Sequence, residues 1–235
     1  RHIFGASALC IQDALQRHDR RLGELLSLLD ALGMEQKTNV VILGDHCQKD
    51  VSMALYPNYW FRKKGWLTVE KGVVKSWRVL ARECDGACYI YLKNRRDSEL
   101  KEQVRRILEK WRQEPSSGLE RFFEQPEIER MGANRDCTFM LEAKDGFFYQ
   151  NESDEPFRQA GYGSGLHAGT HGYLPDKAGY QTIFFGVGPD FVPGARIGSM
   201  SLVDEGPILA RLLGVSLGNT DGRVPGGLLK EENLV

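Results

Sequence analysis

Apolar residues recur through the first part of the chain with the period of an α-helix. Ile11 and the leucines of residues 7–32 fall about 3.6 residues apart among charged side chains, which predicts a long amphipathic helix that Gly33 ends. The apolar run Val40-Val41-Ile42-Leu43 follows after a short loop and predicts a buried strand over residues 39–44. The order helix, short loop, strand is typical of a doubly wound α/β sheet.

The middle of the chain has a different pattern. It predicts strands at 73–74 and 88–92, a helix with Leu100, Val104, Ile107, Leu108 and Trp111 on one face, and a pair of strands at 138–141 and 147–149 joined around Asp145-Gly146. The α/β pattern resumes with a strand at 182–187 and a last helix at 203–213 that Gly214 ends. We therefore expect an α/β core from residues 1–54 and 161–235, with an α+β subdomain of residues 55–160 inserted into it.

Composition and charge restrict the function more than the fold. The 235 residues are 41% hydrophobic and 27% charged, as in ordinary globular proteins, and 31 basic against 32 acidic residues leave a net charge of −1. This balance gives no support to binding of nucleic acid or of a membrane surface. No run of about 18 apolar residues predicts a transmembrane helix. The sequence indicates no oligomeric state.

The five cysteines do not form the pattern of a disulfide framework. Their odd number and scattered positions favour a reducing compartment such as the cytoplasm. Cys84 and Cys88 have the spacing of half a zinc site, but no second Cys or His pair lies near them in the sequence. Reduced, partly buried thiols are the preferred interpretation.

Candidate metal ligands lie in two places, at the end of a predicted strand and in a glycine-containing segment near residue 171. Asp45 and His46 come directly after the strand at 39–44, and open α/β sheets place their sites at such strand ends. His171 lies in Gly-Thr-His-Gly, where glycines allow close approach of the backbone to an ion. His2, His18 and His167 are weaker candidates when each is considered alone. Together the Asp and His residues suggest a metal-dependent hydrolase.

The order of these motifs along the chain resembles the C-terminal portion of the nucleotide pyrophosphatase/phosphodiesterase family of the alkaline phosphatase superfamily. The similar segments run nearly from end to end: His2–Gly5, Leu15–Asp19, Leu22–Leu26, Gly44–His46, Arg62–Leu67, Gly169–Tyr173, Phe185–Pro189 and Leu202–Gly214. The resemblance implies an alkaline phosphatase-like doubly wound sheet, truncated at its N-terminal side, with 55–160 as a cap that selects the leaving group.

The resemblance also implies a site with two divalent metal ions, most commonly zinc, with manganese as the alternative. One ion would be bound by an Asp, by His2 and by His171. The other would be bound by an early Asp, by a Thr or Ser nucleophile, and by Asp45 and His46. Their positions in the sequence, four residues before His171 and directly after His46, make His167 and Cys47 candidates to lie beside these ligands. The ions would lower the pKa of the nucleophile and stabilise the charge on the phosphoryl oxygens of a small phosphate ester or nucleotide.

The sequence departs from the family pattern in two ways. The Asp four residues before His2, the early Asp and the nucleophile would all lie upstream of Arg1. We therefore expect no catalytic nucleophile in this chain, and we expect the missing N-terminal part of the same protein to complete the sheet and the site. Cys47 stands where the family usually has Gly. It would be strained if that position needs a positive φ, and its thiol could also bind zinc.

Two alternatives remain open at this point. One is another hydrolase of the same superfamily, such as a phosphomonoesterase, a sulfatase or a phosphoglycerate mutase-like enzyme, which the identity of the nucleophile would distinguish. The other is a non-catalytic α/β binding module with incidental histidines, which a metal assay would distinguish.

Overall fold

A computed structural model describes residues 1–152 and 154–231 and shows two compact α/β units. Unit 1 consists of Arg1–Gln12 and Cys47–Gln181, and unit 2 of Asp13–His46 and the chain from Thr182 onwards. The predicted division into a core of residues 1–54 and 161–235 and an insert of residues 55–160 stays a prediction. No helix within the described ranges combines the length and the apolar composition needed to cross a bilayer.

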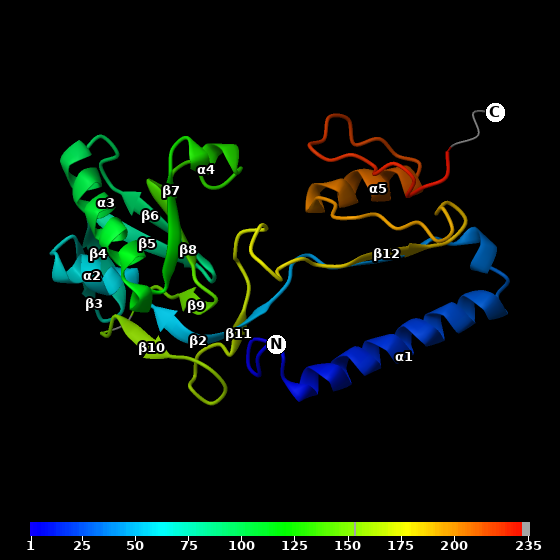
Figure 1. The fold of residues 1–235 in the computed structure, drawn as a ribbon, viewed down its shortest axis with the longest axis horizontal. Helices are drawn as coiled ribbons and strands as arrows, with labels where there is room; N and C mark the ends of the chain where they lie inside the picture. Colours follow the sequence, from blue (N-terminus) through cyan, green and yellow to red (C-terminus); the bar gives the residue numbers. More distant parts are fainter. Residues whose placement is uncertain (153, 232–235) are drawn as a thin grey trace. The chain divides into compact units, whose positions relative to one another are not determined.

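Strand β2 organises the first sheet of unit 1 (Figure 1). It runs parallel to β9 and antiparallel to β10 and β11; the four strands are β2 (Lys49–Leu55), β9 (Gly146–Tyr149), β10 (Phe157–Gln159) and β11 (Gly169–Thr170). Ala54 of β2 and Phe148 of β9 are fully buried in the core of this unit. Helix α2 (Pro57–Lys63) begins directly after β2, with Pro57 in its first turn, where the missing N–H of proline costs no hydrogen bond.

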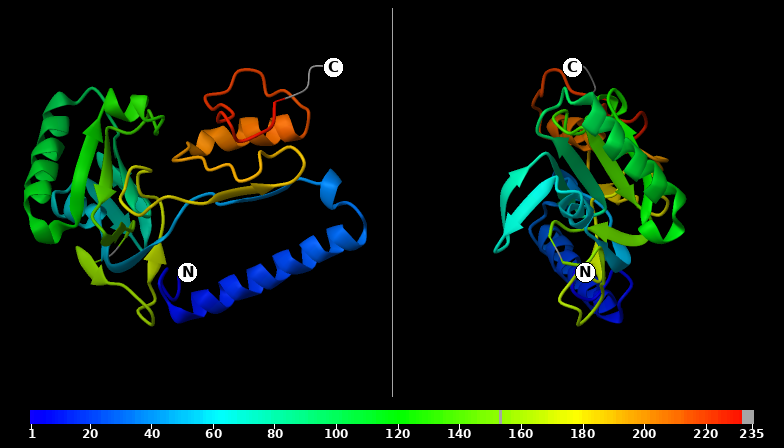
Figure 2. Two further views of the ribbon diagram at one scale, coloured as in Figure 1. Left: turned by 45° about the vertical axis from the view of Figure 1, so that its right-hand side comes forward. Right: turned by 90° about the vertical axis from the view of Figure 1, so that its left-hand side faces the viewer.

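A second, antiparallel sheet of unit 1 has the strand order β5-β6-β8-β7. Its strands are β5 (Val79–Cys84), β6 (Ala87–Leu92), β7 (Leu119–Glu124) and β8 (Phe139–Ala143). Helix α3 (Ser98–Gln113) lies along this sheet and buries Leu100, Val104 and Leu108, which are four residues apart (Figure 2). The Asp97 side chain caps the helix by accepting a hydrogen bond from Leu100 N at 2.9 Å. The predicted helix and its apolar face are therefore confirmed.

The remaining elements of unit 1 are short. The hairpin of β3 (Leu67–Glu70) and β4 (Val73–Trp77) turns at Lys71-Gly72, where both residues have positive φ, as in a two-residue hairpin loop. Helix α4 (Glu127–Arg130) follows β7 and buries Ile128.

The predicted pairing of residues 138–141 with residues 147–149 is wrong. Both segments are strands, but β8 pairs with β6 and β7, whereas β9 pairs with β2. Gly146, with a φ of +84°, redirects the chain after β8. Phe148 and Tyr149 of β9 are adjacent and both buried, so this strand is covered on both faces.

Unit 2 contains the strands β1 (Val40–Leu43) and β12 (Phe184–Val187), which pair antiparallel. This pairing confirms that residues 39–44 and 182–187 contribute to one sheet. Helix α5 (Glu205–Leu212) buries Ile208 in a hydrophobic cluster that also contains Phe191, and Gly214 follows the helix with a φ of +65°. The first predicted helix is α1 (Leu9–Ala31), and none of its residues is buried. Helices α1 and α5 lie on opposite sides of the β1–β12 pair (Figures 1 and 2).

Candidate active site

Three histidines from two distant segments of the sequence lie together in unit 1: His2 from the first and His167 and His171 from the second. The backbone N–H of Ala168 donates to the carbonyl of His2 at 2.7 Å, which fixes the start of the chain beside β11. As a result, the His2 ring centroid lies 4.6 Å from that of His167 and 5.1 Å from that of His171. The His167 ring also stacks on Phe148 of β9 at 5.6 Å. The fold thus brings the predicted ligands His2 and His171 together, with His167 beside them.

Asp85 joins this cluster, and the sequence reasoning did not find it. It lies at the tip of the β5–β6 hairpin with a φ of +54°, and it accepts a hydrogen bond from Thr170 Oγ1 at 2.8 Å. Its carboxylate oxygens lie 3.5 Å from His167 Nδ1 and 3.7 Å from His171 Nε2. The Asp85-Gly86 pair between two apolar runs was a visible signal for a hairpin turn. Its neighbours, more than 80 residues away, were not visible in the sequence.

Burial and charge both favour the neutral form of His2. Its pKa is lowered, first because burial disfavours the imidazolium, and then because His167 and His171 lie close; Asp85 opposes the shift. A neutral imidazole is the form that binds metal ions.

The donor set fits zinc in chemistry but does not complete a site. The Nδ1 atoms of His2 and His167 are buried and have no hydrogen-bond partner, and imidazole nitrogen is a preferred zinc ligand. However, within residues 1–152 and 154–231 no three His, Cys, Asp or Glu side chains are arranged so that they could hold an ion. The cluster therefore supplies ligands of the right kind and needs further ones.

Hydrogen bonds from several elements fix the loop that carries His171. Gly86 N donates to the His171 carbonyl at 2.8 Å, and Gly172 N donates to Tyr180 Oη at 2.9 Å. The Tyr173 hydroxyl donates to the Phe147 carbonyl at 2.7 Å, which ties the loop to β9. The backbone on both sides of His171 is thus held by the hairpin turn and by β9.

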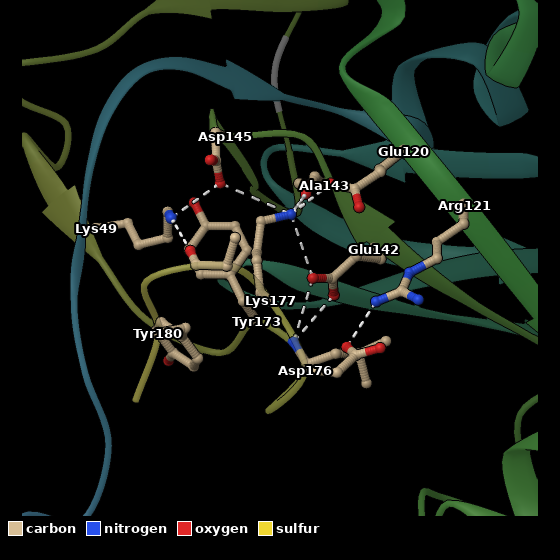
Figure 3. Close-up of polar contacts among 12 residues, drawn as sticks. Lys49, Glu120, Arg121, Glu142, Ala143, Asp145, Tyr173, Asp176, Lys177 and Tyr180 are labelled. Carbon is tan, nitrogen blue, oxygen red and sulfur yellow. Dashed lines mark hydrogen bonds and ion pairs between the residues drawn. The ribbon is translucent and has the colours of Figure 1, made fainter. Parts of the chain in front are cut away.

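A buried ion pair fastens the same loop to β8 (Figure 3). Lys177 is 5% exposed and Glu142 is fully buried. Lys177 Nζ lies 3.4 Å from Glu142 Oε1, and it donates to Glu120 Oε2 at 2.5 Å and to the Ala143 carbonyl at 2.6 Å. Both oxygens of Glu142 also accept from Leu174 N at 3.2 Å. Burial raises the pKa of Glu142 to about 7, against the opposing charge of Lys177.

Asp45 and His46 belong to unit 2 and follow the end of β1. His46 N donates to Asp45 Oδ1 at 3.0 Å, and the side chain of Asp45 is 84% exposed. A Cβ at Gly44 would lie 2.1 Å from Thr182 Oγ1, so a larger residue would displace the backbone just before this pair. The convergence of Asp45 and His46 with His171 on one pair of ions stays a prediction.

Cys47 does not carry the backbone strain considered for it. Lys71 and Asp85 are the non-glycine residues with positive φ in the described part of the chain, so Cys47 has an ordinary backbone conformation. Its thiol donates weakly to the Gln48 carbonyl at 3.5 Å and the Gly179 carbonyl at 3.9 Å. The five cysteines form no disulfide with one another.

The sequence matches the family model of type I phosphodiesterase/nucleotide pyrophosphatase over residues 1–174. The chain belongs to this family. The family comprises hydrolases that act as phosphodiesterases and pyrophosphatases, so the match confirms the resemblance drawn from the Asp-His and Gly-Thr-His-Gly motifs. No curated protein matches the chain.

Solved structures of this family share the fold. Human ectonucleotide pyrophosphatase/phosphodiesterase 5 superposes with a TM-score of 0.71 at 19% identity, covering 98% of this chain and 55% of its own length. The murine protein superposes with a TM-score of 0.70 at 20% identity, covering 97% of this chain and 55% of its own length. An inactive variant of the murine protein in complex with AMP gives 0.69 at 20% identity. The fold is alkaline phosphatase-like, and the chain spans about 55% of the length of these relatives.

Proposed function

We propose that this chain provides half of the metal site of a phosphodiesterase/nucleotide pyrophosphatase that hydrolyses phosphoric ester or diphosphate bonds. The observation that carries the proposal is the cluster of His2, His167 and His171, within a chain that belongs to a phosphodiesterase family. These histidines come from segments more than 160 residues apart, so local sequence does not account for their proximity.

Each candidate ligand has a role in this proposal. His2 and His171 hold one divalent ion, and Asp45 and His46 hold a second. The ions are zinc, or alternatively manganese; when bound they polarise the phosphoryl oxygens and lower the pKa of a hydroxyl nucleophile. The lowered pKa of His2 keeps its imidazole in the neutral, ligating form near neutral pH. The loop held by Lys177 keeps His171 in place.

The nucleophile and the remaining carboxylate ligands are expected from a segment outside the 235 residues. Two findings support this: the chain spans about 55% of the length of its solved relatives, and the described residues contain no complete metal-binding group. Exposed apolar side chains of unit 2, such as Phe185 at 62% and Val187 at 58%, provide a surface that such a segment could cover.

The substrate in this proposal is a small phosphate ester or a nucleotide. An inactive variant of the murine relative has been solved in complex with AMP, which supports a nucleotide for the family member described here. A phosphomonoesterase, sulfatase or phosphoglycerate mutase-like reaction is the alternative on the same fold. A cytoplasmic location also remains a prediction.

The test compares the 235-residue chain with a longer protein that includes the upstream coding sequence. The longer protein is expected to hydrolyse bis(p-nitrophenyl) phosphate with added zinc or manganese, and to lose this activity on chelation. Asp45→Ala and His171→Ala should each abolish it, whereas His18→Ala, on helix α1, should not. If the longer protein hydrolyses no phosphate or sulfate ester, the binding-module alternative replaces this proposal.

A further inference from the structure

The β5–β6 hairpin presents one carboxylate to two of the clustered histidines. Asp85 at its tip is 20% exposed, and its two oxygens divide between the rings: Oδ1 lies 3.5 Å from His167 Nδ1, and Oδ2 lies 3.7 Å from His171 Nε2. A third contact, the 2.8 Å hydrogen bond from Thr170 Oγ1, fixes the carboxylate between them. This side chain is thus directed toward the histidines and is largely withdrawn from solvent.

The backbone of the hairpin turn supports the same arrangement. Gly86 N donates to the His171 carbonyl at 2.8 Å, and Tyr149 N donates to the Asp85 carbonyl at 2.7 Å. A Cβ at Gly86 would lie 2.5 Å from the Tyr173 ring, so the turn packs tightly against the His171 loop. The turn and the loop therefore form one rigid contact within unit 1.

We infer that Asp85 is a positioning residue of the proposed metal site, whose carboxylate orients the imidazoles of His171 and His167. This inference rests on the proposed function for the part that concerns metal. A histidine that binds a metal commonly donates its second ring N–H to a carboxylate, which fixes the ring orientation and the tautomer. The Asp85 carboxylate lies within ion-pair distance of both rings, which places it to take this role.

The positioning role of Asp85 would connect the predicted insert with the histidines that follow it in the sequence. Asp85 lies in residues 55–160, the segment predicted to be an insert, whereas His167 and His171 follow that segment in the sequence. The insert would then orient ligands of the site, in addition to any contact that it makes with a leaving group.

A purely structural role for Asp85 is the competing explanation. Asp is common in two-residue hairpin turns because it tolerates positive φ, and Asp85 has a φ of +54°. Asparagine tolerates this conformation equally well, so Asp85→Asn retains the turn and removes the charge. Asp85→Gly also retains the turn and removes the whole side chain.

The experiment measures two properties of the wild type and its variants. The first is the tautomer of the His167 and His171 rings, from nitrogen-15 NMR of the metal-free chain. The second is the zinc affinity of the longer protein that includes the upstream coding sequence, with the same substitutions, from competition with a chromophoric chelator. Asp136→Asn is the matched control, because it removes one carboxylate charge from an exposed pair with Arg95. Circular dichroism confirms that each variant is folded.

We expect Asp85→Asn and Asp85→Gly to change the ring tautomers and to weaken zinc binding by about 10- to 100-fold, with Asp136→Asn unchanged. Unchanged tautomers in both Asp85 variants would overturn the inference, and so would a zinc affinity of the longer protein that the Asp85 substitutions leave unchanged. If the longer wild-type protein binds no zinc but the ring tautomers of the chain still depend on Asp85, the positioning role stands and the metal part of the proposed function fails.

Discussion

Gly172, next to the candidate ligand His171, shows how single residues shape the site. A Cβ at Gly172 would lie 2.2 Å from the carbonyl oxygen of Cys84, a backbone atom that cannot rotate away. The residue also has a φ of +78°, in the left-handed region that favours glycine. Both features follow from the close packing of the His171 loop on the β5–β6 hairpin.

Gly172→Ala should therefore destabilise the protein by more than the strain of a positive φ alone, because the added Cβ also clashes with Cys84. Gly165 has the same φ of +78°, and a Cβ added there would meet no atom within 4 Å, so Gly165→Ala is the matched control. We expect Gly165→Ala to lower the free energy of unfolding by about 1–2 kcal/mol. Gly172→Ala should cost a further 1–3 kcal/mol, roughly, from overpacking. Urea denaturation of both variants measures the difference; equal losses would contradict the packing described here.

At the residue scale, sequence reasoning selected the candidate ligands that local motifs mark. His171 was visible because glycines surround it, and Asp45-His46 because a strand precedes it. Asp85 was not visible, because its importance depends on a contact across 85 residues with Thr170. His2 alone gave no sign of a role in the sequence, because the histidines that it contacts lie more than 160 residues further along the chain. Only the family resemblance marked it as a candidate ligand.

At the scale of elements, the buried pair of Lys177 and Glu142 connects the His171 loop to strand β8. The folded-state pKa of Glu142, about 7, lies above the value of 4.5 expected for the carboxyl in an unfolded chain. The folded protein therefore holds this proton more tightly. The stability that the raised pKa of Glu142 contributes is therefore fully present below pH 4.5 and is lost as the pH rises through 7.

Glu142→Gln should remove this pH dependence, because glutamine stays neutral. The free energy of unfolding of the wild type should fall by at most about 3 kcal/mol between pH 4.5 and 7, relative to that of the variant. Glu120 still pairs with Lys177 in the variant, so the lysine keeps a partner. Urea denaturation at several pH values measures both proteins. Parallel pH profiles would show that Glu142 is ionised throughout this range.

The elements themselves were predictable where a repeating pattern determines them. Helices α1 and α3 follow from a 3.6-residue period, and the strands β1 and β12 from apolar runs. The pairing of β9 was not predictable, because two short apolar runs joined by Asp145-Gly146 also have the pattern of a hairpin. Burial of Phe148 and Tyr149 on both faces of β9 decides the pairing in favour of β2.

At the scale of the whole molecule, we predict that the 235-residue chain alone is inactive. This prediction rests on the proposed position of the nucleophile outside these residues, because residues that act as a unit in catalysis fail together. We expect no hydrolysis of bis(p-nitrophenyl) phosphate by this chain above the rate of a His171→Ala control, with or without zinc. Metal-dependent turnover by the chain alone would show that the nucleophile lies within it.

The most direct measurement of the central claim is an anomalous-scattering map, recorded at the zinc edge, of crystals of the longer protein grown with zinc. We predict two peaks about 3.5–4 Å apart, one bound by His2 and His171 and the other by Asp45 and His46. A single peak, or two peaks with Asp45 and His46 bound to neither, would contradict the two-metal site proposed for this protein.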